Sequence, residues 1–474
     1  MIDGSSAYGF PQLFERYKSH LGRPMNEQTA AAIGAAVQQQ YVDDGYSRPG
    51  YRILDRGLQS GIVRIRLIEA RIANVELVGR TGPHRHQLQE LFGGLTSDAL
   101  LRPGDITEAL RQARRLPGLV VDVSIEPDAS RSGTYRLDVK SSYKPIEGSV
   151  KLSNRGTEEI GRNLLFAQFI ANGLPGRQSS SGLFLTRAED SSTYSGGGLF
   201  YNAAVGSDGA TARLQFAVTS LQIESDGVVV DQDRQRWLAK FVQPFDRNPE
   251  RDLSAFGGFE LDNLDVAQDG AVSREDRLRS LNAGLLANWR SAGRSSLLSV
   301  EIELGMNAAR SNPDDFSPAG DAEPNNFSIW RTHYARTARL GDSLTWRVDG
   351  YGQYSDEALP SVKQFKVGGG RIGRGFEAAA ASGDRGVGAK LDLRQPIAAD
   401  LPWLGPAQIY GYYDLGAAWR NDSPGRESAA STGVGLTARG ERFAGYLEVA
   451  KPLTHPDADG NKEAGIFAEL TYRF

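Results

Sequence analysis

The sequence contains no cysteine among its 474 residues. It therefore has no disulfide framework and no thiolate metal site, and it is compatible with a compartment where thiols are oxidised. Histidine is scarce, with five residues, and no Ser, His and Asp residues stand at the spacing of a catalytic motif. We therefore expect no enzymatic activity, no cofactor and no bound metal.

A large charge of one sign is also missing. The 54 basic and 58 acidic residues leave a net charge of only −4, so no overall field attracts nucleic acid. No uninterrupted run of about 20 apolar residues occurs, which excludes a helical membrane span. The lack of such a run does not exclude a transmembrane β-barrel, because only alternate residues of its strands face lipid.

The N-terminal stretch MIDGSSAYGFPQ lacks the basic and apolar parts of an export signal. If the protein is exported, we expect that a signal has been removed or that the chain begins inside a longer one. A chain of 474 residues is too long to fold around one ordinary hydrophobic core, so we expect several domains or one large closed sheet.

Residues 1–143 show helical and strand patterns in the same order twice. In 26–42, for example, Ala30, Ile33 and Val37 share one helical face. The predicted helices are 10–21, 26–42, 86–92 and 103–115, and the predicted strands are 51–53, 61–69, 72–78, 120–126 and 135–140. We therefore expect two small α+β repeats, at 1–70 and 71–143.

From residue 144 to 474 the helical spacing disappears, and apolar residues recur at every second position. In LSVEIEL (298–304) and VGAKLDLR (387–394), every second residue is apolar, and the residues between are polar, charged or glycine. A water-soluble β-sandwich shows the same alternation and is the commoner architecture. The number of such segments favours a barrel instead, since about sixteen fit at roughly 20 residues each, as in transmembrane barrels.

Two further features favour the barrel. The chain ends in mid-strand, with Leu470, Tyr472 and Phe474 on the lipid-facing register, as a C-terminal barrel signal that leaves no open sheet edge. Aromatic residues also recur near predicted strand ends, as interface girdles require: Tyr194, Trp237, Trp330, Trp346, Tyr410, Trp419, Tyr446 and Tyr472. We therefore expect an all-β transmembrane barrel of about sixteen antiparallel strands, preceded by the two α+β repeats.

One stretch fits neither a helix nor a packed strand. VGGGRIGRGF (367–376) is rich in glycine and reads as a long loop. Its GGGRIG formally matches a dinucleotide-binding motif, but an amphipathic strand follows where that motif needs a helix. His84 and His86 lack a nearby acidic cluster, and the acidic run 312–323 lacks EF-hand spacing, so both are interpreted as loop residues.

Several motifs along the chain resemble one family. Gly373-Arg374-Gly375-Phe376 stands, between FKVGG and SGDRG, where the two-partner secretion transporters carry a [V/I]-R-G-[Y/F] tetrad. YGYYDLGAAW (410–419) is similar to a later strand with an inward aspartate, here Asp414, and the strand VELVG resembles part of a polypeptide-transport-associated (POTRA) repeat. The resemblance, to the hemolysin secretion/activation type (ShlB/FhaC/HecB-like) of the POTRA-plus-barrel superfamily, spans essentially the whole chain.

The chain departs from the family pattern at three places. Gly373 stands where a β-branched residue is usual. The strand that normally opens a POTRA repeat is missing from the first repeat, and no plug helix precedes Phe10. We therefore expect a truncated or atypical start, and we do not expect gating by a plug.

The resemblance implies a function. A transporter of this type lies in the bacterial outer membrane with its POTRA repeats in the periplasm, and it passes an unfolded exoprotein, a large β-helical adhesin or hemolysin, outward through the lumen without ATP. Other expected partners are outer-membrane lipid, lipopolysaccharide and the barrel-assembly machinery. Two alternatives stay open: a barrel-assembly insertase of the same superfamily and a passive porin.

The resemblance also implies that the loop folds back into the barrel, where Arg374 pairs with Asp414. A guanidinium offers a planar fork that matches a carboxylate, and the pair is stronger in a confined lumen than on a surface. In the repeats, an exposed strand edge can bind an unfolded chain by β-augmentation. Beside it, Arg111, Arg114 and Arg115 either steer an acidic segment of the exoprotein or form a solvated helix face.

Overall fold

The computed structural model describes residues 1–54, 63–96, 99–128, 132–174, 178–189, 193–206, 208–225, 227–248, 250–306, 326–401, 405–423, 425–454 and 463–474. The predicted acidic loop at 312–323 and the start of the strand predicted at 61–69 lie outside these ranges. Backbone contacts divide the chain into one unit at Met1–Pro145 and a second that comprises Ile146–Leu174 and Ser179–Phe474.

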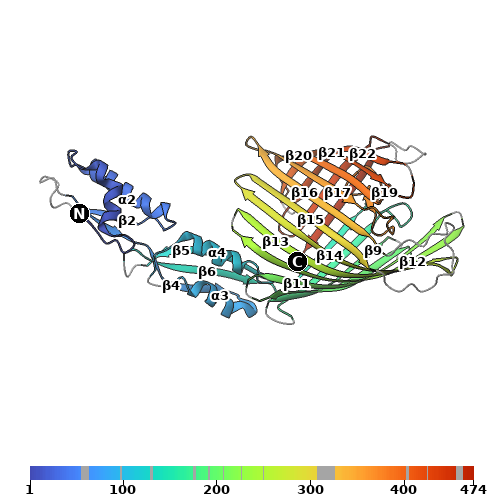
Figure 1. Cartoon of the computed structure of the whole chain (residues 1–474), viewed down its shortest axis with the longest axis horizontal. Coiled ribbons are helices and arrows are strands. Elements are labelled where there is room, and N and C mark those ends of the chain that lie inside the picture. The colour runs from blue at the N-terminus through green and yellow to red at the C-terminus, as the bar shows by residue number, and fades with distance from the viewer. Residues whose placement is uncertain are drawn as a thin grey trace. The chain divides into compact units, whose positions relative to one another are not determined.

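The second unit is a closed barrel. Sixteen strands of the described chain close it, each hydrogen-bonded to its neighbours in the order in which they follow in the sequence (Figure 1). They are β7 (Ile146–Ser153), β8 (Leu164–Asn172), β9 (Ser179–Ala188), β10 (Tyr194–Val205), β11 (Ala210–Ser225), β12 (Val228–Arg247), β13 (Arg251–Gln268), β14 (Ala271–Ser291), β15 (Arg294–Met306), β16 (Ser328–Leu340), β17 (Leu344–Tyr354), β20 (Arg385–Leu401), β21 (Gly405–Trp419), β22 (Glu427–Arg439), β23 (Phe443–Pro452) and β24 (Gly465–Arg473). The expected barrel is thereby confirmed.

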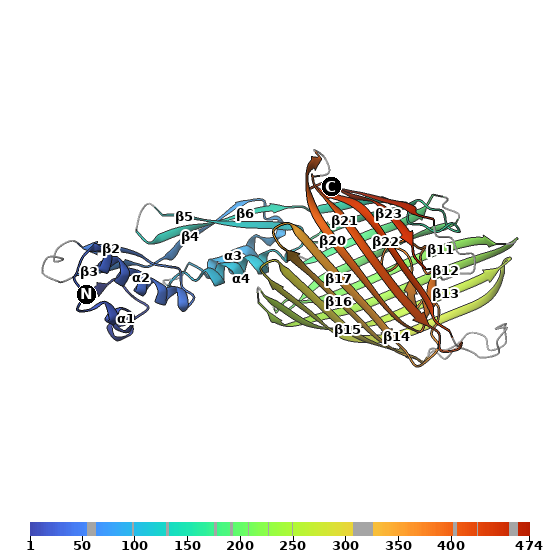
Figure 2. The same cartoon turned by 90° about the horizontal axis from the view of Figure 1, so that it is seen from above.

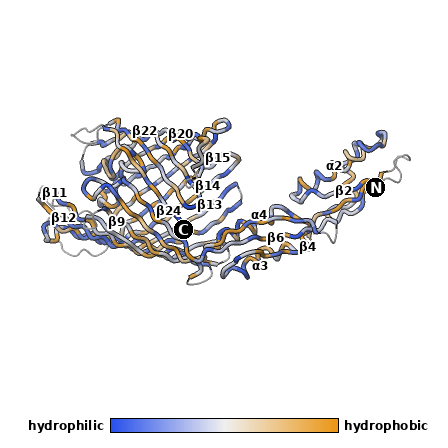
Figure 3. The backbone as a smooth tube through the Cα atoms, turned by 180° about the vertical axis from the view of Figure 1, so that it is seen from behind, coloured by the Kyte–Doolittle hydropathy of each residue, from blue (hydrophilic) through white to orange (hydrophobic). Residues whose placement is uncertain are grey.

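The alternation read from the sequence sorts side chains between the two faces of this wall. Leu199 and Val434 are 59% exposed on the outer face, whereas Glu303 and Asp414 are buried on the inner face. Orange and blue segments alternate along the barrel strands in Figure 3. Two aromatic residues assigned to the outer girdles are exceptions, because Tyr410 is buried and bonds to inner-wall Glu448, and the Tyr446 hydroxyl accepts from Arg155.

The last residues close the barrel against the first. β24 pairs with β7 over five residue pairs, from Glu469 and Ser153 to Arg473 and Ser149. Leu470, Tyr472 and Phe474 are partly exposed on the outer face. The Phe474 ring covers Gly148, where an added Cβ would lie only 2.2 Å from it, and the two residues exchange backbone hydrogen bonds.

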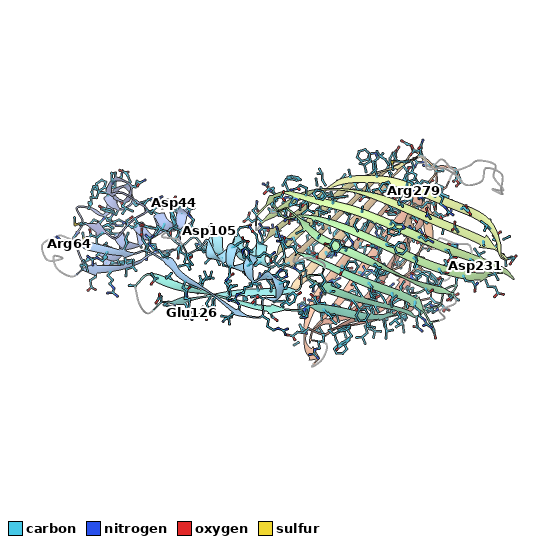
Figure 4. The ribbon with its side chains drawn as sticks, turned by 90° about the horizontal axis from the view of Figure 1, so that it is seen from below. Asp44, Arg64, Asp105, Glu126, Asp231 and Arg279 are labelled. Atoms are coloured by element: carbon cyan, nitrogen blue, oxygen red, sulfur yellow. The ribbon has the colours of Figure 1, made fainter. Side chains whose placement is uncertain are left out.

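Strand length varies around the barrel. β11 to β14 have 16 to 21 residues each, whereas a tilted strand needs only about 9–11 residues to cross a membrane. Their ends project beyond the neighbouring strands in Figures 1 and 2. Figure 4 locates Asp231 near one such end of β12 and Arg279 on β14. None of the helices in the described residues is long and apolar enough to cross a membrane.

The first unit contains two α+β modules, coloured blue and cyan in Figure 1. The first has the sheet order β1-β3-β2, and the second has β4-β6-β5. In both, the opening strand runs parallel to the middle strand, which is antiparallel to the third. The strands are β1 (Ile2–Asp3), β2 (Gly50–Leu54), β3 (Arg64–Ile68), β4 (Arg71–Gly79), β5 (Leu119–Pro127) and β6 (Thr134–Tyr143).

The expectation that the first repeat lacks its opening strand is therefore wrong. Ile2 and Asp3 form β1, which pairs with Ile65 and Arg66 of β3. A strand of two residues shows no apolar period, so alternation alone does not detect it.

Helices pack on each of the two sheets. The first module has α1 (Phe10–Tyr17), η1 (Lys18–His20) and α2 (Glu27–Asp43), and the second has η3 (Gly82–His84), α3 (Arg85–Gly93) and α4 (Pro103–Ala113). Asn26 caps α2 by accepting from the Thr29 amide at 2.8 Å. Ile33 and Val37 of α2 are buried in one core, and Leu88 and Phe92 of α3 in the other.

A buried carboxylate ties the N-terminal residues to the first module. Glu69 accepts from the Ser6 amide at 2.7 Å, from the Ala7 amide at 3.3 Å and from the Tyr41 hydroxyl at 2.7 Å. Burial raises the pKa of the Glu69 carboxyl, but these hydrogen bonds outweigh burial and hold the pKa below its usual range. Its ionised form therefore stabilises the fold.

We predict that Glu69→Gln loosens the first module. The neutral amide loses one acceptor and the charge, which should cost about 1–3 kcal/mol. Hydrogen exchange of the whole chain in detergent should be faster at residues 1–8 than in the wild type. The matched control is Glu90→Gln, whose side chain is 67% exposed, and equal exchange in the two variants would contradict the assignment.

The same carboxylate predicts an acid-sensitive first module. Because the folded pKa is lowered, its contribution is complete above the unfolded pKa of about 4.3 and is lost as the pH falls through the folded value. Exchange at residues 1–8, corrected for the intrinsic pH dependence of amides, should accelerate below about pH 4 in the wild type. Glu69→Gln should show no such step.

Candidate functional site

The connection between β17 and β20 folds back into the barrel. We call this segment, residues 355–384, the lumen loop. It contains a short antiparallel hairpin of β18 (Phe365–Val367) and β19 (Ala381–Gly383). Its side chains contact inward-facing residues of the wall, and the VGGGRIGRGF stretch lies in it.

Glycine permits the tight turns at the tip of the lumen loop. Gly373 has φ = 81°, in the left-handed region where a β-branched residue is strained. Its carbonyl accepts from the Phe376 amide at 3.0 Å, and the Gly369 amide donates to the Phe376 carbonyl at 3.0 Å. The departure of Gly373 from the family pattern therefore has a local reason in this chain.

Arg374 is the central charge of the site and is only 6% exposed. Its Nε and Nη2 donate to the two carboxylate oxygens of Asp414 at 2.8 and 2.7 Å, which is the bidentate fork geometry. The Arg374 backbone amide donates to the same carboxylate at 3.1 Å. Nη2 also donates to Asp392 of β20 at 2.6 Å.

An aromatic ring and further charged side chains also lie close to the Arg374 guanidinium. The guanidinium carbon lies 3.5 Å from the centre of the Tyr412 ring, which is a close cation–π contact. Glu448 of β23 lies 3.8 Å from Arg374 and accepts from the Tyr410 and Tyr412 hydroxyls at 2.8 and 3.3 Å. Arg155 pairs with Glu448 and also donates to the Arg374 carbonyl at 3.1 Å.

The charges in this cluster balance. Arg374, Arg155 and Arg394 face three carboxylates, those of Asp392, Asp414 and Glu448. Each ion thus has a partner of opposite sign, and all but Arg394, which is 37% exposed, are largely shielded from water. Removing one member of such a buried pair typically costs about 3–5 kcal/mol, because the remaining charge stays desolvated.

Small wall residues let the lumen loop approach closely. A Cβ at Gly386 would lie 2.0 Å from the Phe365 ring, and one at Gly416 would lie 2.8 Å from Val367. Phe376 is buried with Val367 and Ile372 in an apolar cluster that also contains Ala418 and Ala429 of the wall. The β20–β22 face is thus shaped to receive the loop.

Sequence reasoning named Arg374 and Asp414, and the structure brings them together. Asp392 lies on the polar face of the predicted strand 387–394, and Glu448 alternates with apolar residues in the same way, so alternation assigns both to the inner face of a barrel. The sequence does not pair either of them with Arg374. Arg155 follows β7 in a connection, where no periodicity signals its direction, and it was missed.

The three arginines of the second module occupy different environments. Arg111 lies in α4 and pairs with Glu108, and Arg114 Nε donates to the Val121 carbonyl at 3.2 Å. Arg115 follows α4 and is exposed. The helix predicted at 103–115 ends as α4 at Ala113.

The two histidines do not lie in a loop as expected. His84 is fully buried, with its ring nitrogens 3.1 Å from the Gln87 side-chain oxygen and 3.0 Å from the Pro117 carbonyl. His86 is in α3 and faces Glu90. The side-chain roles of both are accounted for within the second module.

Comparison with known proteins agrees with this geometry. The family model of the haemolysin secretion/activation protein ShlB/FhaC/HecB matches residues 233–438. The outer membrane transporter CdiB of Escherichia coli O6:K15:H31 (strain 536 / UPEC) is 24% identical over 95% of this chain and 78% of its own length. The heme/hemopexin transporter protein HuxB of Haemophilus influenzae (strain 86-028NP) is 21% identical over 92% of this chain and 79% of its own length.

Solved structures share the fold. CdiB from Escherichia coli superposes with a TM-score of 0.73 at 20% identity, covering 100% of this chain and 89% of that chain. BamA from Haemophilus ducreyi lacking POTRA domains 1–3 gives a TM-score of 0.59 at 14% identity, covering 100% of this chain and 98% of that one.

Together, the fold and the similarity to outer membrane transporters define an outer-membrane protein in which small periplasmic α+β modules precede a sixteen-stranded transmembrane barrel. Within that class, the chain is similar to transporters of the haemolysin secretion/activation (ShlB/FhaC/HecB) type, whose family model matches residues 233–438. Because β17 and β20 are the eleventh and twelfth strands after the periplasmic modules, the lumen loop starts and ends on the extracellular side.

We predict that Gly375→Ala displaces the tip of the lumen loop. An added Cβ would lie 2.9 Å from the Ser431 side chain and 3.0 Å from the backbone of Lys451 and Pro452, which cannot give way easily. Such overpacking typically costs about 1–3 kcal/mol. Secretion of the exoprotein should fall at an unchanged barrel level.

The matched control is Gly370→Ala in the same loop. There the added Cβ would meet only the Arg155 side chain, at an ordinary 3.8 Å. Equal secretion by the two variants would show that close packing at Gly375 is not required.

Proposed function

We propose that this transporter secretes an unfolded exoprotein through its barrel lumen without ATP, and that the buried Arg374–Asp414 pair controls this passage by holding the lumen loop inside. The observation that carries the proposal is the bidentate pair itself, whose two side chains are 7% and 0% exposed. A charge buried this deeply fixes the position of the loop that bears it.

The inner wall supports passage of a hydrated chain. Charged side chains of both signs line it and pair across strands, as Arg234 does with Asp262 and Arg347 with Asp349. Such a surface offers hydrogen bonds to a polypeptide backbone but no continuous apolar face for a lipid. The small number of histidines and the absence of a catalytic motif in the sequence favour a pore that does no chemistry.

The proposed division of labour follows the chain. Residues 1–70 and 71–143 act as two POTRA-like repeats that receive the exoprotein in the periplasm, and residues 144–474 form the pore. By family resemblance the exoprotein is a large β-helical adhesin or hemolysin. Outer-membrane lipid and lipopolysaccharide surround the barrel, and the barrel-assembly machinery inserts it, reading the C-terminal Leu470, Tyr472 and Phe474.

One observation favours a second candidate function, the insertion of barrel proteins by lateral opening. The seam between β24 and β7 has five residue pairs, whereas β7 and β8 share eight. Separating two strands that share fewer residue pairs breaks fewer backbone hydrogen bonds and therefore requires less free energy. The two functions differ in product, since secretion releases a soluble exoprotein to the medium and insertion leaves a folded barrel in the membrane.

We predict that Arg374→Ala and Asp414→Ala each reduce secretion of the co-expressed exoprotein by at least about tenfold, because each leaves a desolvated partner charge or an unheld loop. The exoprotein is to be sought first in the neighbouring gene. The control is Arg371→Ala, since Arg371 lies in the same loop and contacts only the Tyr351 ring at 4.6 Å among the contacts described. Wild-type secretion by both variants, at normal barrel levels, would refute the proposal.

We also propose that Arg111, Arg114 and Arg115 steer an acidic segment of the exoprotein toward the second module. Because exposed ion pairs contribute only about 0.2–1 kcal/mol each, replacing all three by alanine should weaken binding several-fold and not abolish it. The measurement is the affinity of the whole chain for acidic exoprotein peptides at low and high salt. If affinity and its salt dependence were unchanged, the arginines would be a solvated helix face.

A further inference from the structure

A second cation of the lumen loop is buried far from Arg374 along the wall. Lys363 is 6% exposed, and its Nζ lies 3.0 Å from Glu260 of β13 and 2.6 Å from Glu303 of β15. Its carbonyl accepts from the Gln353 side chain at 3.0 Å, and its amide donates to the Pro360 carbonyl at 2.8 Å. Lys363 belongs to residues 355–364, which we call the loop arm.

Apolar contact and one further carboxylate hold the loop arm in the same place. Leu359 is 1% exposed and packs with Leu278 of β14, with Ile329 of β16 and with Phe327, which precedes β16. The Leu359 amide donates to Asp384 at 2.8 Å, and Asp384 also accepts from the Asn421 amide at 2.7 Å. The arm is therefore a packed element of the barrel interior.

The two buried anchoring cations of the lumen loop, Lys363 and Arg374, bind different parts of the barrel wall. Arg374 contacts β20, β21 and β23, whereas Lys363 contacts β13 and β15. In the closed order of sixteen strands, β15 and β21, which carry Glu303 and Asp414, are four strands apart, and the outermost partner strands, β13 and β23, are eight apart. The lumen loop is thus held inside the barrel at two separate stretches of the wall.

The two anchors differ in what their release leaves behind. If Lys363 leaves, Glu260 keeps Arg236 at 2.8 Å, and Glu303 keeps Arg331 and the Ser280 hydroxyl at 2.7 Å. If Arg374 leaves, Asp414 loses all three of the hydrogen bonds that its carboxylate accepts within the described chain, and its strand partner Lys390 is left beside it. Release at Lys363 is therefore the less costly of the two.

We propose that Lys363 is the releasable anchor of the lumen loop: the loop arm detaches from the β13–β15 wall to open the lumen, while the Arg374 anchor stays bound and guides the arm back. This inference rests on the proposed secretion function and adds the residue that sets the closed state. Lys363 is a positioning residue, since it acts through the loop.

Conductance of the purified transporter in planar bilayers tests the proposal without an exoprotein. Lys363→Met keeps the length of the side chain and removes its charge, and it should raise the ratio of open to closed channels by about tenfold, equivalent to about 1.4 kcal/mol. Lys366→Met is the matched control, since Lys366 lies three residues on in β18 and makes the same charge change. Equal conductance of the wild type and both variants would overturn the proposal.

Cross-linking tests whether the loop arm must leave the wall during secretion. Because the chain contains no cysteine, Lys363→Cys and Glu303→Cys can be bridged selectively by a short bis-maleimide with a reducible linker. Secretion should stop on cross-linking and return on reduction, while each single variant treated with the reagent should continue to secrete. Unchanged secretion by the cross-linked protein would also overturn the proposal.

The outcomes distinguish this inference from the secretion mechanism beneath it. If Arg374→Ala abolishes secretion but Lys363→Met leaves conductance at the wild-type level, the loop is needed and Lys363 is not its releasable anchor. If Arg374→Ala secretes normally, the proposed role of the lumen loop fails, whatever the conductance of Lys363→Met.

Discussion

Burial of the Arg374 guanidinium is the constraint on which the rest of the barrel interior depends. A buried cation needs carboxylates in fork geometry, and Asp414 and Asp392 provide them from two neighbouring strands. The strands must hold a fixed register so that both carboxylates point inward together, and Lys390 and Asp414 are direct partners in that register. The glycines at 386 and 416 follow from the same constraint, because larger residues would keep the loop off the wall.

Much of this architecture was predictable because its signals are periodic. Alternation over residues 144–474 predicts a barrel and assigns Asp392, Asp414 and Glu448 to its inner face. Family resemblance adds the loop and the pairing of Arg374 with Asp414. The order of helices and strands in the first unit was read correctly, apart from the two-residue strand Ile2–Asp3, which is too short to show a period.

The remaining contacts depend on tertiary folding. Lys363 meets Glu260 and Glu303, which are 103 and 60 residues away in the sequence, and nothing local marks these partners. Aromatic residues near strand ends usually face the interface, which favours the outer girdle for Tyr410, whereas alternation with Tyr412 and Asp414 favours the lumen. In this barrel the Tyr410 hydroxyl bonds to the buried Glu448, so hydrogen bonding inside the lumen decided its direction.

The lumen loop is held at two separate stretches of the barrel wall, one through Arg374 and one through Lys363. Arg374 binds Asp414 in bidentate geometry. Lys363 instead binds Glu260 and Glu303, two carboxylates that also pair with Arg236 and Arg331. The most direct test of the central claim, that Arg374 holds the loop inside the lumen, uses Gly370→Cys in this cysteine-free chain. The measurement is the rate at which a bulky polyethylene glycol maleimide labels that cysteine on intact cells. We predict slow labelling with Arg374 present and fast labelling in the Arg374→Ala background, and equal rates in the two would contradict the account.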